Sequence, residues 1–149
     1  MTSAFNLRTY RDTDEDAVIE LWFRTWQQAY PSIDFSARLD NWRIRWRNEL
    51  VPSACIVVAE QDTKIIGFVT IDQTGYLDQL VVDPESWGSE LGNALMTEAK
   101  AMSPNGITLL VNTDNARAIR FYTRNGFRHT HDDVNPVSGR PVSGMAWKP

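Results

Sequence analysis

Residues 111–127 read VNTDNARAIRFYTRNGF, a strand that ends and is followed at once by a short helix. Asn115 lies at the expected helix start, where its side chain can accept a hydrogen bond from the first turn. Ala118 and Tyr122 are four residues apart and share one face of that helix. Gly126 ends the helix. Taken alone, this stretch favours an N-cap role for Asn115 and a core role for Tyr122.

A second stretch, residues 80–96, reads LVVDPESWGSELGNALM. It predicts a strand, a turn containing Pro84, a loop containing glycine and then an apolar helix. The first backbone N–H groups of a helix are unpaired and lie at the positive end of its dipole, so such a loop can bind a phosphate. An ordinary connection between a strand and a helix explains the pattern equally well.

Working outward from these stretches, apolar periodicity predicts the other elements. Thr13 and Asp16 form a capping-box pattern at the start of the first helix. The step from 76 to 111 predicts a right-handed parallel crossover. We therefore expect an α+β fold, a mixed, mostly antiparallel sheet flanked by helices in the order β-α-α-β-β-β-α-β-α-β-β. The expected strands are 5–11, 54–60, 64–71, 76–82, 107–111, 127–131 and 142–147, and the expected helices are 13–30, 36–50, 88–102 and 115–124.

Length and composition limit the class of protein. The 149 residues predict a single domain, 1–149, and 42% hydrophobic with 23% charged residues argue against disorder. The single cysteine, Cys55, excludes an internal disulfide and is expected in the core. No apolar run is long enough for a membrane span, and no signal-peptide pattern is found, so we expect a soluble, cytoplasmic protein. A net charge of −4 argues against a nucleic-acid partner.

In this order and spacing, the two stretches together resemble the GCN5-related N-acetyltransferase (GNAT) superfamily. The resemblance implies transfer of an acetyl or other short acyl group from acetyl-CoA, the co-substrate, to a primary amine. The acceptor could be a small-molecule amine or a peptide amine, and the aromatic first helices slightly favour a small molecule. The residues that carry the resemblance are Leu80, Val81, Val82, Pro84, Asn115, Ala118, Tyr122, Gly126 and Phe127.

The resemblance also implies roles for individual residues. The strands 76–82 and 107–111 would diverge, with the pantetheine arm in the gap, and the amide of Val81 could stabilise the oxyanion. The Tyr122 hydroxyl would act as the general acid for the CoA thiolate. The implied cofactor-binding residues are Leu80, Val81, Val82, Trp87, Gly88, Ser89, Glu90, Leu91, Gly92, Asn93, Asn115 and Ala118.

Two loop positions depart from the usual family pattern, [QR]-x-x-G-x-[GA]. Trp87 occupies the first position and Glu90 replaces the central glycine. Two unit charges about 5 Å apart repel by about 3 kcal/mol at an effective dielectric constant near 20. Glu90 is therefore expected to weaken cofactor binding about a hundredfold unless its side chain turns into solvent. This leaves an alternative function, a weakly active or inactive acyl-CoA-binding regulatory module.

Residues for the acceptor side are less well defined. Asp78 is the first choice for a general base, although a residue of this kind is more often a solvated or cap-forming carboxylate, and ordered water could serve instead. Trp26 and Tyr30 are the candidates for substrate contact, although aromatic residues at helical spacing are more often core. Arg43, Arg45 and Arg47 are expected on a solvated helix edge, with contact to an acidic substrate as a minor option. A homodimer is a further option that the sequence does not decide.

His129, His131 and Asp132 have a spacing that metal ligands can show. No second cluster of potential ligands accompanies them in the sequence. We therefore expect no metal site.

Overall fold

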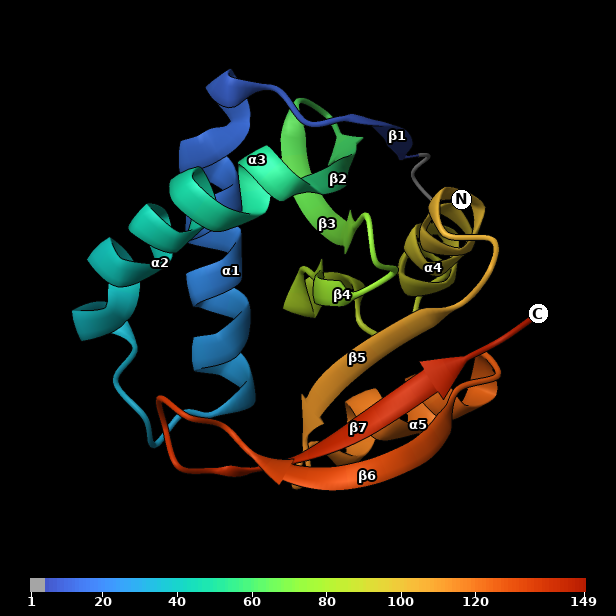
Figure 1. Cartoon of the computed structure of the whole chain (residues 1–149). Coiled ribbons are helices and arrows are strands. Elements are labelled where there is room, and N and C mark those ends of the chain that lie inside the picture. The colour runs from blue at the N-terminus through green and yellow to red at the C-terminus, as the bar shows by residue number, and fades with distance from the viewer. Residues whose placement is uncertain (1–4) are drawn as a thin grey trace.

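The computed structural model describes residues 5–149, so the first four residues of the expected 1–149 domain lie outside the described residues. The elements follow the expected order along the chain (Figure 1). The strands are β1 (Asn6–Thr9), β2 (Ala54–Gln61), β3 (Lys64–Asp72), β4 (Leu77–Val82), β5 (Ile107–Asn112), β6 (Arg128–Val134) and β7 (Pro141–Trp147). The helices are α1 (Glu15–Ala29), α2 (Leu39–Arg45), α3 (Val51–Ser53), α4 (Leu91–Met102) and α5 (Ala116–Arg124), with 3-10 turns at Asp12–Asp14, Ser36–Arg38 and Pro84–Ser86 and a π-helical turn at Trp46–Leu50.

The strands form two sheets, β1-β2-β3-β4 and β5-β7-β6, in which all neighbouring strands are antiparallel. An isolated parallel bridge between Tyr76 and Thr108 joins them, and the Thr108 N–H donates to the Gly75 carbonyl at 3.0 Å. Beyond this bridge β4 and β5 are not paired. The two strands therefore meet where they begin and diverge toward their carboxyl ends, and this confirms the expected mixed, mostly antiparallel α+β fold.

The four-stranded sheet has a hydrophobic core on each face. Ile56 and Val58 of β2 pack with α1 and the π-helical turn, whereas Val57 and Ala59 pack with α4. This alternation follows from the period of two in a strand. Figure 1 shows α1 and α2 on one side of this sheet and α4 on the other.

Aromatic side chains fill the core between α1 and α2. Trp22 stacks on Trp42 with ring centroids 4.8 Å apart, and Trp46 is completely buried. Trp26 meets the rings of Phe35 and Trp42 at 5.8 and 6.0 Å. The aromatic residues at helical spacing therefore build a core first, and only the ends of the helices reach the site.

Two expected helix starts need correction. The helix expected from residue 88 begins at Leu91, because Gly88 has φ +81° and cannot continue a right-handed helix. The capping box expected from Thr13 and Asp16 does not form. Asp14 instead accepts the Arg11 N–H at 2.8 Å, and Arg8 donates two further bonds to the same carboxylate.

The expected helix 36–50 forms a longer helical run with a π-helical turn, from Ser36 to Ser53. No helix among residues 5–149 combines the length and the hydrophobicity needed to cross a membrane.

Candidate active site

The free edge of β4 lines the gap between the two sheets. The Asp83 N–H donates to the Ile66 carbonyl at 2.8 Å, which fixes the alternation of the β3–β4 ladder. In an antiparallel pair, alternate residues bond to the partner strand and the residues between them face away. Leu80 and Val82 therefore direct main-chain groups into the gap.

The same register corrects the expectation for Val81. Val81 lies opposite Phe68 and two residues before Asp83, so its amide and carbonyl face β3. Its side chain is buried against the α1 side of the sheet. The amide of Val81 is therefore directed away from the position proposed for an oxyanion.

A bulge interrupts β4 upstream of this edge. Leu77 to Leu80 spans one residue more than the facing stretch from Val69 to Ile71. The Gln79 N–H donates instead to the Thr70 hydroxyl at 3.1 Å. A bulge bends a strand and re-aims its groups, so the irregular part of β4 lies where the two sheets begin to separate.

Tyr122 lies in the core that lines this gap. It is 8% exposed and packs in the same cluster as Leu80, Val82 and Ala118. Burial raises the pKa of the Tyr122 phenol to about 12. The hydroxyl makes no hydrogen bond within residues 5–149. The structure thus brings together residues from both sequence stretches and leaves the phenol protonated and without a partner.

Asn115 caps α5, as the residues alone suggested. Its Oδ1 accepts the Ala118 N–H at 3.1 Å. Its Nδ2 donates to no described residue. One half of the amide therefore holds the helix start, and the other half remains free to bond a ligand in the adjacent hollow.

The loop before α4 presents unpaired amides. Within the described part of the chain, the N–H groups of Gly88, Glu90, Gly92 and Asn93 have no acceptor. The expectation for the other loop amides needs correction, because they already have partners. The bonds run from Trp87 N to Pro84 O at 3.2 Å, from Ser89 N to Ser86 O at 3.1 Å, and from Leu91 N to Ser89 Oγ at 3.3 Å.

Glu90 fits this loop without strain. Its φ and ψ of −73° and −9° are right-handed, a conformation open to any residue, and its side chain is exposed. Gly92 is more restricted, because a Cβ there would lie 3.0 Å from Cε1 of Phe121. Because the Glu90 side chain is exposed to solvent, we expect it to repel a bound phosphate only weakly.

A hollow of about 280 Å³ lies between this loop, the end of α1 and the start of α5. Trp87 closes one side, where its Nε1–H donates to the Val82 carbonyl at 2.9 Å. The Arg117 guanidinium lies over the Trp87 ring, 3.7 Å from its centroid. Arg117 was not among the residues expected from the sequence, where only its place two residues after Asn115 could have indicated it. The lining residues are Gln28, Ala29, Tyr30, Trp87, Asp114, Asn115, Ala116 and Arg117.

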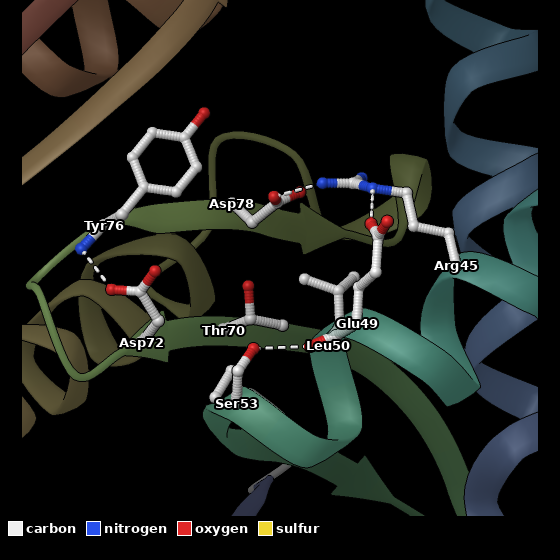
Figure 2. Close-up of a pocket in the computed structure, with 9 residues that line it drawn as sticks. Arg45, Glu49, Leu50, Ser53, Thr70, Asp72, Tyr76 and Asp78 are labelled. Atoms are coloured by element: carbon white, nitrogen blue, oxygen red, sulfur yellow. Dashed lines mark hydrogen bonds and ion pairs between the residues drawn. The ribbon is translucent and has the colours of Figure 1, made fainter.

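A second hollow, of about 120 Å³, lies on the other side of the bulge (Figure 2). Asp78 of β4 and Tyr76, which precedes β4, line it together with Thr70 and Asp72 of β3. Arg45 reaches from α2 to pair with Asp78, so the expectation of a solvated helix edge is wrong for this arginine. Its Nε also lies 3.1 Å from Glu49.

The pairing of Asp78 bears on its expected role as a base. Its Oδ2 accepts from Arg45 and its Oδ1 from the Gln79 side chain at 3.0 Å. Each carboxylate oxygen of Asp78 therefore already accepts one hydrogen bond and keeps a further lone pair that an amine proton could reach.

The two aromatic candidates for substrate contact have different positions. Tyr30 lines the larger hollow and ties the end of α1 to the end of β5, because its hydroxyl accepts from Asn112 and donates to Asp114, both at 3.1 Å. The Arg140 guanidinium lies 4.5 Å from the centre of the Tyr30 ring. Trp26 lies in the aromatic core and lines neither hollow.

The histidines lie on the exposed strand β6. His129 Nε2 is 2.9 Å from Asp132 Oδ1, and His131 Nε2 is 4.0 Å from an oxygen of Asp133. In the part of the chain described, no three or more histidine, cysteine or acidic side chains gather as potential metal ligands. Cys55, expected in the core, is exposed.

Comparison with known proteins agrees with this geometry. The model of the acetyltransferase (GNAT) family matches residues 15–127. The chain is 28% identical to the peptidyl-lysine N-acetyltransferase YjaB of Salmonella typhimurium, over 91% of this chain and 92% of that protein, and 29% identical to the peptidyl-lysine N-acetyltransferase YiaC of Escherichia coli, over 95% of both.

Among solved structures, the PaiA N-acetyltransferase of Thermoplasma acidophilum in complex with coenzyme A has the same fold. The TM-score is 0.76 at 20% identity, over 98% of this chain and 99% of that one. The chain therefore belongs to the acetyltransferase (GNAT) family of acetyl-CoA-dependent N-acetyltransferases.

Proposed function

We propose that this protein transfers the acetyl group of acetyl-CoA to the side-chain amine of a lysine in a protein or peptide. The observation that carries the proposal is the free edge of β4 at Leu80 and Val82, where the Val82 carbonyl accepts from Trp87, combined with the Tyr122 phenol in the same cluster, whose hydroxyl has no partner among the described residues. The four unpaired amides between Gly88 and Asn93 fit the phosphates of the same donor.

Each chemical step then has a group in this chain. The main chain of Leu80 and Val82 aligns the pantetheine arm, as an added strand is held by a sheet edge. The neutral amine attacks the thioester carbonyl, so that a C–N bond forms and the C–S bond breaks. Tyr122 gives its proton to the departing sulfur, and the proton lost by the amine passes to water or to Asp78. General acid catalysis of this kind contributes about 10²–10⁴-fold.

Burial suits Tyr122 to this role. A phenol whose pKa is raised to about 12 stays protonated throughout the pH range in which an amine acceptor becomes neutral. The thiolate of CoA therefore always meets a proton donor. The absence of a competing hydrogen bond inside residues 5–149 leaves that proton free to move.

The smaller hollow supports a cationic acceptor. Its lining holds the carboxylates of Glu49, Asp72 and Asp78 against the single guanidinium of Arg45. A lysine side chain approaches as an ammonium ion, which such a lining attracts. The YjaB and YiaC relatives act on peptidyl lysine, and this moves the proposal from the small molecule that the sequence slightly favoured to a lysine side chain.

The test is an acetylation assay with acetyl-CoA and a panel of lysine peptides with blocked N-termini. Unaltered protein should acetylate the lysine Nε, detected by mass spectrometry. Tyr122→Phe should lower kcat at least a hundredfold while the Kd for acetyl-CoA stays within about twofold. Tyr10→Phe is the matched control, because Tyr10 bonds Trp46 at 3.0 Å in the core between the first helices.

Two results would contradict the proposal. Full turnover by Tyr122→Phe would remove this phenol from the reaction. Acetylation of small amines with no activity on any peptide would replace the lysine acceptor by a small molecule. A protein that binds acetyl-CoA but acetylates nothing would support the regulatory module instead.

A further inference from the structure

Trp87 forms a fixed aromatic surface at the entrance to the larger hollow. Its indole N–H donates to the Val82 carbonyl at 2.9 Å, which fixes the orientation of the ring at the end of β4. The four unpaired amides of Gly88, Glu90, Gly92 and Asn93 follow directly in the chain. Position 87 itself supplies no charge to a ligand bound there.

Arg117 supplies the charge from another element. Its guanidinium lies 3.7 Å from the centre of the Trp87 ring, which is close for a cation–π contact. Stacking of this kind suits arginine, because the planar guanidinium keeps its N–H groups at the edge and free to donate. The start of α5 and the loop before α4 are thereby joined across the hollow.

Arg117 is also free of carboxylates. Within the described residues it forms no ion pair, and the groups that affect its pKa are Tyr122, Tyr30 and Arg120. The Arg117 side chain is exposed, and partial desolvation beside Trp87 lowers the pKa of the guanidinium, which remains a cation. Six other arginines of the described residues form ion pairs with acidic side chains, namely Arg8, Arg24, Arg43, Arg45, Arg47 and Arg140.

We propose that Arg117 binds the diphosphate of acetyl-CoA, with Trp87 as the surface that positions its guanidinium beside the loop amides. The inference rests on the proposed use of acetyl-CoA as donor. The stacked guanidinium lines the hollow without an acidic partner among the described residues, and a diphosphate supplies the two acceptors that its fork can bond.

The diphosphate is favoured over the 3′-phosphate by the neighbours of the guanidinium. The unpaired amides begin one residue after Trp87, so a phosphate that meets the stacked Arg117 meets those amides as well. Among the described residues, Arg117 is the arginine of α5 that contacts the Trp87 ring.

The experiment measures binding, which does not depend on turnover. Calorimetric titration gives the Kd of CoA and of 3′-dephospho-CoA for the unaltered protein, Arg117→Ala, Arg117→Lys and Trp87→Leu. We expect Arg117→Ala to raise both Kd values about ten- to a hundredfold, the range for loss of charge-assisted hydrogen bonds. Arg117→Lys keeps the charge without the planar stack, so its Kd values should lie between those of the unaltered protein and those of Arg117→Ala.

The role of Trp87 as a positioning residue has its own readout. Trp87→Leu should raise both Kd values about three- to tenfold. In the Trp87→Leu background, Arg117→Ala should raise the Kd values by a smaller factor than it does in the unaltered protein. Simple damage to the loop would instead give additive losses. Arg120→Ala is the matched control on the same helix, and circular dichroism confirms that each variant is folded.

The outcomes separate this inference from the function on which it rests. Equal Kd values for the unaltered protein and Arg117→Ala, with lysine acetylation intact, would overturn the inference and leave the function standing. A loss seen with CoA and absent with 3′-dephospho-CoA would overturn the diphosphate assignment in favour of the 3′-phosphate. Failure of the unaltered protein to bind either ligand would overturn both proposals.

Discussion

The Tyr122 ring is buried in a hydrophobic core, while its hydroxyl has no hydrogen-bond partner among the described residues and is not one of the fully buried unpaired atoms. A polar group at the edge of a core can therefore meet a ligand that reaches it from the gap. At a site for transfer from a thioester, we expect that ligand to be the CoA sulfur. The residue that looked like core in the sequence is therefore both core and proposed acid.

This burial predicts a pH dependence of stability. The phenol has a pKa of about 12 in the folded protein and near 10 in the unfolded chain, so its contribution is complete below pH 10 and is lost as the pH rises toward 12. In that window the free energy of unfolding should fall by up to about 1.4 kcal/mol per pH unit from this residue.

Denaturant titrations of the unaltered protein and of Tyr122→Phe at pH 8 to 11 would measure the effect. The difference between the two curves isolates Tyr122 from the other tyrosines. Parallel curves across pH 10 to 11 would contradict a raised pKa.

At the scale of the element, the loop before α4 shows which residues its shape requires. Gly88 has φ +81° and needs glycine, whereas Glu90 has the dihedral angles of an ordinary helix start. The glutamate therefore changes the charge of the loop and leaves its backbone unstrained.

Gly88→Ala tests whether this loop shape serves the cofactor. A left-handed conformation costs a residue with a Cβ about 1–2 kcal/mol, so stability should fall by about 1 kcal/mol. Acetyl-CoA affinity should fall about tenfold, because the amides that follow shift. Denaturation and calorimetric titration give the two quantities.

Gly139→Ala is the matched control. Gly139 has φ +73°, and a Cβ at either glycine would meet no atom within 4 Å, but Gly139 lies in the loop between β6 and β7. It should show the same loss of stability with unchanged affinity. Equal acetyl-CoA affinities for Gly88→Ala and Gly139→Ala would show that cofactor binding does not depend on the shape of this loop.

For the whole molecule, the joint between the two sheets sets the width of the gap. Gly75 lies at this joint with φ +84°, and a Cβ there would lie 2.7 Å from the Gly106 carbonyl oxygen and 2.8 Å from Ser103 Oγ. The Gly75 carbonyl also accepts the Thr108 N–H. Tyr30, Asn112 and Asp114 tie the far ends together through α1.

Gly75→Ala should therefore lower the free energy of unfolding more than Gly139→Ala does, although the two glycines have a similar positive φ. Backbone strain of about 1 kcal/mol is joined by about 1–3 kcal/mol of steric overlap with backbone atoms that cannot move aside. Urea denaturation of both variants gives the comparison. A loss of stability no larger than that of Gly139→Ala would contradict this prediction, because it would show that the atoms around Gly75 move aside at no cost.

The sequence by itself determined the order of the elements, the cap at Asn115 and the family resemblance. These features depend on local patterns, namely apolar periodicity, turn residues and side-chain-to-backbone hydrogen bonds within a few positions. The same patterns placed Asn115, Ala118 and Tyr122 on one short helix.

Only the tertiary structure decided which groups meet across elements. The register of β3 and β4 directs Leu80 and Val82 to the gap and turns Val81 away, Arg45 pairs with Asp78 from 33 residues away, and Arg117 stacks on Trp87. The physical reason is that register and side-chain pairing depend on contacts between segments distant in the chain, about which local periodicity carries no information.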